Sequence, residues 1–234
     1  MIKNRGQIKS DVRDNLVDLS INFYSDSDIN ESLQDGYQDF CILTQCIQKS
    51  IVLNWVNNLS YYNFPALGVS DYLGCIAIFN NVTNLYLRDD LSIKDFDRIR
   101  RDWENWIGTP LFWAPSDPLR IAICAKYQVV AQSAAFFAGG FSNAYFIDSS
   151  YSSLGTFKLM YYAQAPVLQS DTDGFVGISS DMQQALTQYV TADLLEQAQE
   201  FTKASLVWDN YNENVASYAD RVKRINKSDL LLRV

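Results

Sequence analysis

Histidine is absent from the 234-residue sequence, which excludes several common kinds of active site. Without it there is no Ser-His-Asp or Cys-His nucleophile, no HExxH zinc site and no imidazole to act as general base near neutral pH. The GxxxxGK[ST] and GxGxxG loops that bind phosphates and dinucleotides are also missing. An enzyme would have to use carboxylates alone, for example Asp102 and Glu104. Because residues two apart on a helix face apart, this is a poor acid/base pair, and we expect no catalytic, cofactor or metal site.

Positive charge is scarce as well. The chain has 19 lysines and arginines against 27 aspartates and glutamates, a formal net charge of −8. This balance argues against broad affinity for nucleic acid or anionic lipid. No run approaches the roughly 18 apolar residues of a membrane span, and the polar opening MIKNRGQIKSDVRDN is unlike a signal peptide. The sequence therefore predicts an intracellular, soluble product that contacts no membrane.

Cysteine is rare, and its spacing is not that of a metal or redox motif. Cys41, Cys46, Cys75 and Cys124 include no CxxC pair. Cys41 and Cys46 are five residues apart on an expected helix, so their side chains should point in different directions. We interpret all four as buried free thiols.

Two stretches near the N-terminus have helical periodicity. Apolar residues recur at helical spacing over residues 8–19. A second helix is expected to begin at Ser25, an N-cap with Asp28 three residues later, and to run to about Trp55. The acidic residues between 26 and 39 lack the glycine and alternating oxygens of a calcium loop. We interpret them as a solvated helix face, partly favoured by the helix dipole.

The pattern changes from residue 59 to about 165 into short apolar runs separated by turn residues. LGCIAIFNNVTNLYLRDD predicts a hairpin that turns at Asn80-Asn81. Strands are also predicted in residues 119–130 and 155–166, and in the second of these apolar and other residues alternate. Residues 134–147 could form another hairpin, with the Gly139-Gly140 pair near its tip.

Three of the five tryptophans lie close together in RDWENWIGTPLFW. A helix over residues 92–107 is predicted, with Ser92 and Asp95 as a capping box and Phe96 on its apolar stripe. A glycine then ends the helix, and a proline prevents its resumption before the next strand. We predict a structural helix-to-strand corner, in preference to a ligand site, formed by Trp103, Trp106, Gly108, Pro110 and Trp113.

The last third is expected to be helical again. Ser180 can cap a helix from Asp181 to about Ile225, with a bend or break near residue 210 in the polar run WDNYNENV. Apolar and aromatic residues recur at heptad spacing, and such a helix would be longer than a domain of this size is wide. The leucine-rich end is either a frayed tail or a docking peptide. The predicted contacts with another subunit or partner are Phe201, Trp208, Tyr211, Val215, Tyr218, Val222, Ile225, Leu230, Leu231 and Leu232.

The order of these elements predicts an α+β fold. We expect a helical bundle formed by the N-terminal helix pair and the long C-terminal helices, with an inserted β-rich region that carries one helix. The predicted parts are residues 1–58, 59–166 and 167–234. The first and last of these are expected to form one helical domain.

Three groups of residues, in this order and spacing, carry a resemblance to a known family. The first group is Val12-Arg13-Asp14, Asp18, Ser25-Asp26, Asp28-Ile29 and Leu33. The second is Trp103, Gly108, Pro110 and Trp113. The third is Leu159, Tyr161, Tyr162, Pro166, Leu168, Asp171, Asp173, Ala185, Leu186, Tyr189, Val190, Ala192, Leu194 and Leu195. Together they resemble the head-to-tail adaptor proteins of tailed bacteriophages, also called connector, ring or neck proteins, especially those of short-tailed phages.

The sequence departs from this family's pattern in two places. The stretch from Ser116 to Tyr145 is longer than expected between the tryptophan corner and the next strand. FVGISS stands where the loop before the C-terminal helix usually ends with a proline.

The resemblance implies a structural virion protein of the neck, assembled in the host cytoplasm. Such a chain would form a homo-oligomeric ring of about twelve copies under the portal protein and hold further tail or ring proteins. Genomic DNA would pass through the ring without sequence-specific binding, and an acidic channel would attract its phosphates less. The alternative hypothesis is an aromatic-rich module of a virion that binds carbohydrate or a receptor.

Overall fold

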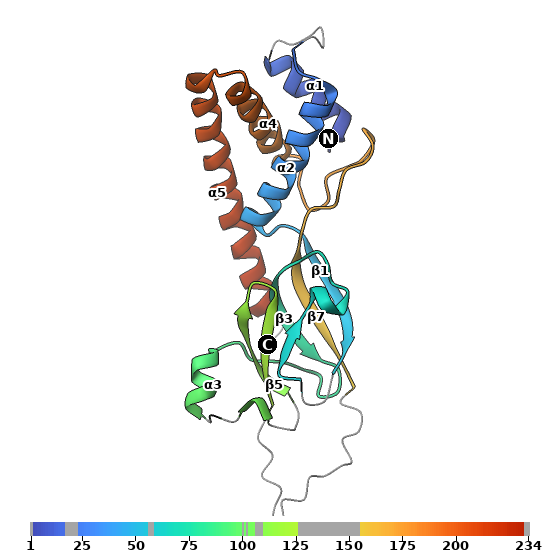
Figure 1. Ribbon diagram of the computed structural model, residues 1–234, viewed down its shortest axis with the longest axis vertical. Coiled ribbons are helices and arrows are strands. Elements are labelled where there is room, and N and C mark those ends of the chain that lie inside the picture. Colours follow the sequence, from blue (N-terminus) through green and yellow to red (C-terminus); the bar gives the residue numbers. More distant parts are fainter. Residues whose placement is uncertain are drawn as a thin grey trace, which may run out of the picture. The chain divides into compact units, whose positions relative to one another are not determined.

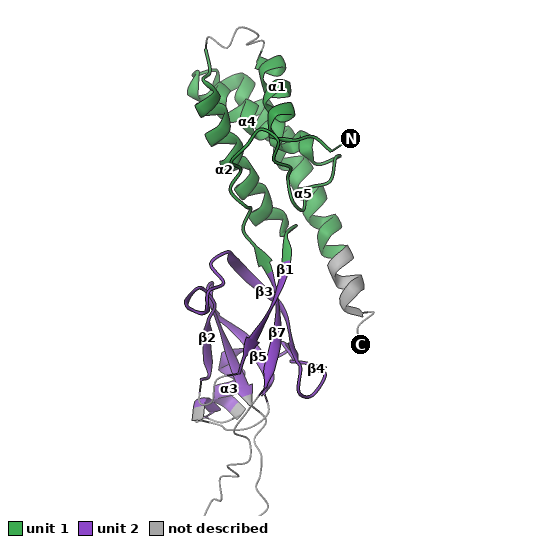
Figure 2. Ribbon diagram, turned by 90° about the vertical axis from the view of Figure 1, so that its right-hand side faces the viewer, with its two compact units in different colours: residues 1–48, 162–234 green, residues 49–161 purple. Residues whose placement is uncertain are grey.

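The protein is described by a computed structural model that covers residues 2–16, 23–55, 59–99, 101, 103–105, 110–125 and 155–231 (Figure 1). It contains helices and two antiparallel sheets, so the predicted α+β class is confirmed. The chain divides into two compact units, shown in different colours in Figure 2. Residues 1–48 and 162–234 form the helical unit, and residues 49–161 form the β unit. The first boundary thus falls at residue 48, earlier than the predicted 58.

Within its described residues, the helical unit contains two helices before the β unit and two after it. These are α1 (Arg5–Leu16), α2 (Asp26–Thr44), α4 (Gln183–Gln197) and α5 (Phe201–Leu231). Helix α4 packs against the other three, and α2 also contacts α5. Their apolar stripes meet in a shared core. Fully buried members of this core include Ile8, Val12, Ile29, Leu33, Phe40, Leu186, Val190 and Leu194.

Helix α2 begins as predicted but ends early. The Ser25 side chain accepts a hydrogen bond from the Asp28 backbone N–H at 3.1 Å, and the Asp28 carboxylate accepts one from the Ser25 N–H at 3.0 Å. The prediction that this helix continues to Trp55 is wrong. Gln45 takes a left-handed conformation with φ 54°, and its N–H donates to the Cys41 carbonyl at 2.9 Å. This backbone bond terminates the helix.

Strand β1 (Gln48–Asn54) occupies the segment that was expected to continue the helix. It pairs with strand β7 (Thr156–Ala163), which supplies the hydrogen bonds that a helix would otherwise provide. Trp55 then packs on Phe157 of β7 with ring centroids 4.2 Å apart. The local periodicity of this segment is compatible with a helix, but pairing with β7 makes it a strand.

The C-terminal helical region is two helices joined by a short turn. Helix α4 ends at Gln197, and Gln199 takes a left-handed conformation with φ 63°. The predicted break near residue 210 is wrong, because α5 runs unbroken through that run. The predicted cap is also wrong, since α4 starts after Met182 with no side-chain cap bond. The turn lets α5 fold back antiparallel on α4, and packing between the two helices replaces the expected single long helix.

The described residues of the β unit form two sheets. One has the strand order β1-β7-β3-β4 and the other β2-β6-β5. The remaining bounds are β2 (Tyr61–Asn63), β3 (Tyr72–Asn80), β4 (Leu85–Tyr86), β5 (Pro110–Asp117) and β6 (Arg120–Ala125), with 3₁₀ turns at Pro65–Leu67 and Trp103–Asn105.

Two of the predicted β features are confirmed in the β unit. Strands β3 and β4 form the predicted hairpin, with Phe79 opposite Tyr86. The predicted turn at Asn80-Asn81 is wrong, because Asn80 still pairs with Leu85 and the left-handed residue of the turn is Asn84, with φ 56°. In β7, Phe157, Leu159 and Tyr161 are buried in alternation, as predicted. The predicted hairpin at 134–147 lies outside the described residues.

The predicted helix over residues 92–107 is shorter in the structure. Ser92 and Asp95 form the expected capping box, but α3 (Ile93–Ile99) ends early and Trp103 starts a 3₁₀ turn. The rings of Phe96 and Trp103 lie 5.1 Å apart. Residues seven apart on a continuous α-helix are separated by roughly 10 Å along its axis, so this contact requires the helix to end.

The tryptophan corner is partly described. Trp103 is buried, and its indole N–H donates to the Asp97 carboxylate at 3.0 Å. It belongs to a core cluster with Phe96 and Ala114. Trp113 is buried too, but it precedes Ala114 on strand β5 and so faces the opposite side of the sheet. Pro110 begins that strand, while the predicted corner residues Trp106 and Gly108 lie outside the described residues.

No helix in the described part of the chain is both long enough and apolar enough to span a membrane.

Candidate functional site

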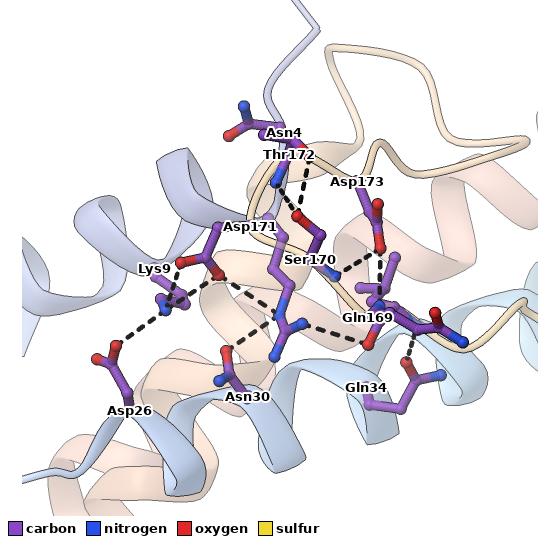
Figure 3. Close-up of polar contacts among 12 residues, drawn as sticks. Asn4, Lys9, Asp26, Asn30, Gln34, Gln169, Ser170, Asp171, Thr172 and Asp173 are labelled. Atoms are coloured by element: carbon purple, nitrogen blue, oxygen red, sulfur yellow. Dashed lines mark hydrogen bonds and ion pairs between the residues drawn. The ribbon is translucent and has the colours of Figure 1, made fainter.

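A row of basic residues on α1 joins this helix to the start of α2 and to the loop before α4. Arg5, Lys9 and Arg13 recur every four residues on one helix face; the first two are buried and the third is mostly buried. Lys9 lies between two carboxylates from distant parts of the chain (Figure 3). Its Nζ is 3.1 Å from Asp26 Oδ2 and 3.1 Å from Asp171 Oδ1. One ammonium group therefore joins α1 to the start of α2 and to the loop before α4.

The two neighbouring arginines extend this contact. The Arg13 Nη2 lies 2.6 Å from Asp26 Oδ1. These hydrogen bonds, from Arg13 first and Lys9 second, lower the pKa of Asp26 below its usual value. Arg5 donates to the Asn30 side-chain oxygen at 3.0 Å and to the Leu168 carbonyl at 3.2 Å. The guanidinium and ammonium groups are thus satisfied although they lie away from solvent.

The loop from residue 168 to 173 also caps α1 through its backbone. The first turn of a helix has N–H groups with no partner inside the helix. Here the Arg5 N–H donates to the Asp173 carbonyl and the Gly6 N–H to the Asp171 carbonyl, both at 2.9 Å. The Asp173 carboxylate accepts the N–H groups of Gln169 and Ser170, which lowers its pKa and closes the loop on itself.

We call these residues the α1 network: Arg5, Lys9, Arg13, Asp26, Asn30, Leu168, Asp171 and Asp173. It joins members of the first and third groups that carry the family resemblance, although those groups lie far apart in the sequence. Sequence reasoning missed Arg5, Lys9 and Asn30. The four-residue spacing of Arg5, Lys9 and Arg13 is the signal that could have located the two basic residues, whereas Asn30 has no such signal.

A second junction holds α2 against α4. A Cβ atom placed on Gly36 would lie 2.6 Å from Tyr189 Cδ1 and 2.8 Å from Tyr189 Cγ. Because Gly36 has no side chain, the Tyr189 ring can pack directly against the backbone of α2. The same ring contacts Trp208 and Tyr211 of α5 edge to face, at centroid distances of 5.0 and 5.4 Å. We call Tyr189, Trp208 and Tyr211 the aromatic cluster.

We predict that Gly36→Ala lowers the free energy of unfolding of the helical unit by about 1–3 kcal/mol, because the new methyl group overlaps a packed ring. The gain in helix propensity, about 1 kcal/mol, offsets only part of this. Urea denaturation followed by circular dichroism measures the change. Gly174→Ala is the matched control, because a Cβ there meets nothing within 4 Å. In a Tyr189→Ala background the Gly36→Ala change should no longer destabilise; equal destabilisation in both backgrounds would show that the ring is not the cause.

Three of the predicted subunit contacts are buried within their own chain. Tyr211, Val215 and Tyr218 are covered inside the helical unit. The Tyr211 hydroxyl donates to Asp39 at 2.8 Å, and the Tyr218 ring packs 5.5 Å from that of Phe40. This corrects the prediction that these residues contact another subunit or partner. The turn after α4 gives α5 a packing partner in its own chain, whereas the sequence predicts a partner in a second subunit.

The other predicted contacts differ in exposure. Phe201 is 64% exposed, whereas Trp208 and Val222 are partly buried. Trp208 also donates from its indole N–H to Glu196 at 2.9 Å. Helix α5 includes residues 225–231, but the side chains of Ile225, Leu230 and Leu231, and the whole of Leu232, lie outside the described part of the chain.

One end of the helical unit has exposed apolar side chains. Phe201 begins α5 and Leu206 lies five residues further along it, and each is 64% exposed. Phe23 is 73% exposed, and the neighbouring Tyr24 hydroxyl donates to the Leu194 carbonyl near the end of α4. These contacts place Phe23 at the end of the unit where α4 turns into α5. We call Phe23, Phe201 and Leu206 the apolar end.

Among the described residues, the remaining aromatic and carboxylate candidates are partly buried or hydrogen-bonded. Every tryptophan and tyrosine among the described residues is at least partly buried, which disfavours a carbohydrate-binding surface built from them. Glu104 accepts a hydrogen bond from the Tyr61 hydroxyl at 2.7 Å, which raises the pKa of Tyr61 to about 12. Asp102, its suggested catalytic partner, lies outside the described residues.

No protein-family model and no curated protein matches this sequence.

Proposed function

We propose that this chain is a structural virion protein, a head-to-tail adaptor that docks under the portal as a homo-oligomeric ring. In this role it extends the DNA channel and provides an attachment site for further tail components. The observation that best supports the proposal is the α1 network. Arg13 and Asp26, from the first group of family-like residues, are joined through Lys9 to Asp171, from the third. Residues from two of the three groups that carry the resemblance therefore take part in one network of ion pairs.

The network has a physical use in an assembly protein. A subunit in a ring must present its contacts in a fixed geometry, because small errors accumulate as the ring closes. Buried cations shared between α1, α2 and the loop before α4 hold these segments in one arrangement. The unit is thereby preorganised, which reduces the entropy lost on association.

Exposed apolar surface supplies the driving force for docking in this proposal. The apolar end leaves Phe23, Phe201 and Leu206 in contact with water. Apolar and aromatic residues at the centre of an interface contribute most of its stability. The net negative charge fits passage of DNA through a channel without tight binding.

The mass of the purified chain, alone and with the portal protein of the same virus, tests this function. We expect a stable complex that contains one portal ring and a fixed number of copies of this chain. Light scattering coupled to size-exclusion chromatography gives the stoichiometry. Failure to bind the portal at micromolar concentration, or binding in a variable ratio, would contradict the proposal.

A further inference from the structure

Two thiols lie close together at the end of α2, contrary to the expectation from their spacing. The Sγ atoms of Cys41 and Cys46 are 3.6 Å apart. Five residues apart on a continuous helix, they would point in different directions. The helix ends at Thr44, however, and Gln45 turns back in a left-handed conformation. This turn places the Cys46 side chain against that of Cys41.

The surroundings of the two sulfurs differ. Cys41 is buried, whereas Cys46 is partly exposed. The hydrogen bond between the two thiols lowers the pKa of Cys46, because a Cys46 thiolate can accept it from Cys41. The β unit provides a contrast. There burial raises the pKa of Cys75 and raises that of Cys124 to about 11, so these thiols are poor nucleophiles.

We propose that Cys41 and Cys46 are a modification site, at which a peroxide oxidant forms a reversible intrachain disulfide. The Cys46 thiolate attacks one peroxide oxygen, breaks the O–O bond and releases hydroxide, leaving a sulfenic acid. The Cys41 sulfur then attacks the Cys46 sulfur, the S–O bond breaks and water leaves. Two thiols and one hydrogen peroxide become one disulfide and two waters. A dithiol reductant reverses the change.

The disulfide would act on the connection between the two units. Residues 45–47 link α2 to β1, and the chain passes from the helical unit to the β unit at residues 48–49. A bond from Cys41 to Cys46 closes a small ring around the left-handed Gln45 and holds the end of the helix in its turned form. Oxidation thus restricts the backbone of this connection. The inference does not depend on the proposed function.

Peptide mass spectrometry of the full chain tests the site. The protein is treated with hydrogen peroxide, alkylated under denaturing conditions and digested with trypsin. Both cysteines lie in the single tryptic peptide 14–49, because Arg13 and Lys49 are the basic residues that bound it. We expect this peptide to lose about 2 Da and both alkylation sites together, and dithiothreitol to restore them. Loss at Cys75 and Cys124 should be about tenfold slower or more.

Two variants distinguish the steps. In Cys41→Ser the reaction should stop at a Cys46 sulfenic acid, which dimedone traps. In Cys46→Ser, which changes the more exposed position, Cys41 should stay alkylatable as in the untreated protein. Two results with wild-type protein would overturn the proposal. One is oxidation of all four cysteines at similar rates, and the other is oxidation of Cys46 without a bond to Cys41. Circular dichroism confirms that each variant used is folded.

Discussion

Replacing Tyr211 by alanine is expected to lower the free energy of unfolding of the helical unit by about 3–5 kcal/mol, the usual cost of truncating a large buried aromatic residue. Tyr211 is 1% exposed and belongs to the aromatic cluster that joins α4 to α5. Its removal leaves a cavity and takes the hydroxyl donor from Asp39. Urea denaturation followed by circular dichroism measures the loss.

Two controls separate the causes of this effect. Tyr211→Phe removes only the hydrogen bond to Asp39 and should cost about 1 kcal/mol. Leu206→Ala changes an exposed residue on the same helix and should change stability by less than about 0.5 kcal/mol. If Tyr211→Ala left the denaturation midpoint unchanged, α5 would not be packed on its own chain. The apolar face of this helix would then need a second subunit to cover it.

Truncation after Asn226 is expected to abolish attachment to the portal while leaving the helical unit folded. The deletion removes Leu230, Leu231 and Leu232. Among the described residues of α5, the buried ones run from Ala204 to Ala219 and so precede the deletion. In the proposed function, the apolar tail docks on the portal. Co-sedimentation with the portal measures attachment, and circular dichroism measures helix content.

A full-length variant with serine at the three leucine positions is the matched control. It keeps the chain length and should also fail to bind, because apolar burial drives the docking. Retained attachment in both proteins would refute a docking role for the tail. The apolar end, formed by Phe23, Phe201 and Leu206, would then be the next surface to substitute.

Local sequence patterns predicted the elements that local chemistry determines. Ser25 and Asp28 form a reciprocal cap within four residues, and the same holds for Ser92 and Asp95. The β3–β4 hairpin and the alternating burial of β7 also follow from short-range patterns. Each of these features depends on neighbours in the sequence, so no knowledge of the fold was needed.

The errors arose where distant contacts decide the structure. Residues 48–54 fit a helix by periodicity, but pairing with β7 makes them a strand. The break at residues 198–200 has no proline or glycine to reveal it. It is fixed instead by the packing of α5 on α4, and this packing also buries Tyr211.

The α1 network and the thiol pair could not be located from sequence for the same reason. Lys9 gains its partners only when the loop before α4 reaches α1. Cys41 and Cys46 meet only because the helix ends between them in a left-handed residue. A single sequence contains the residues of these sites but not the turns that assemble them.

Electron cryomicroscopy of the portal mixed with this chain tests the central claim most directly. The account predicts a closed ring of this protein seated coaxially on the portal, with the channel continuing through it. Particles in which the portal is bare, or in which single copies bind its outer surface without closing a ring, would contradict the assignment of this chain as a head-to-tail adaptor.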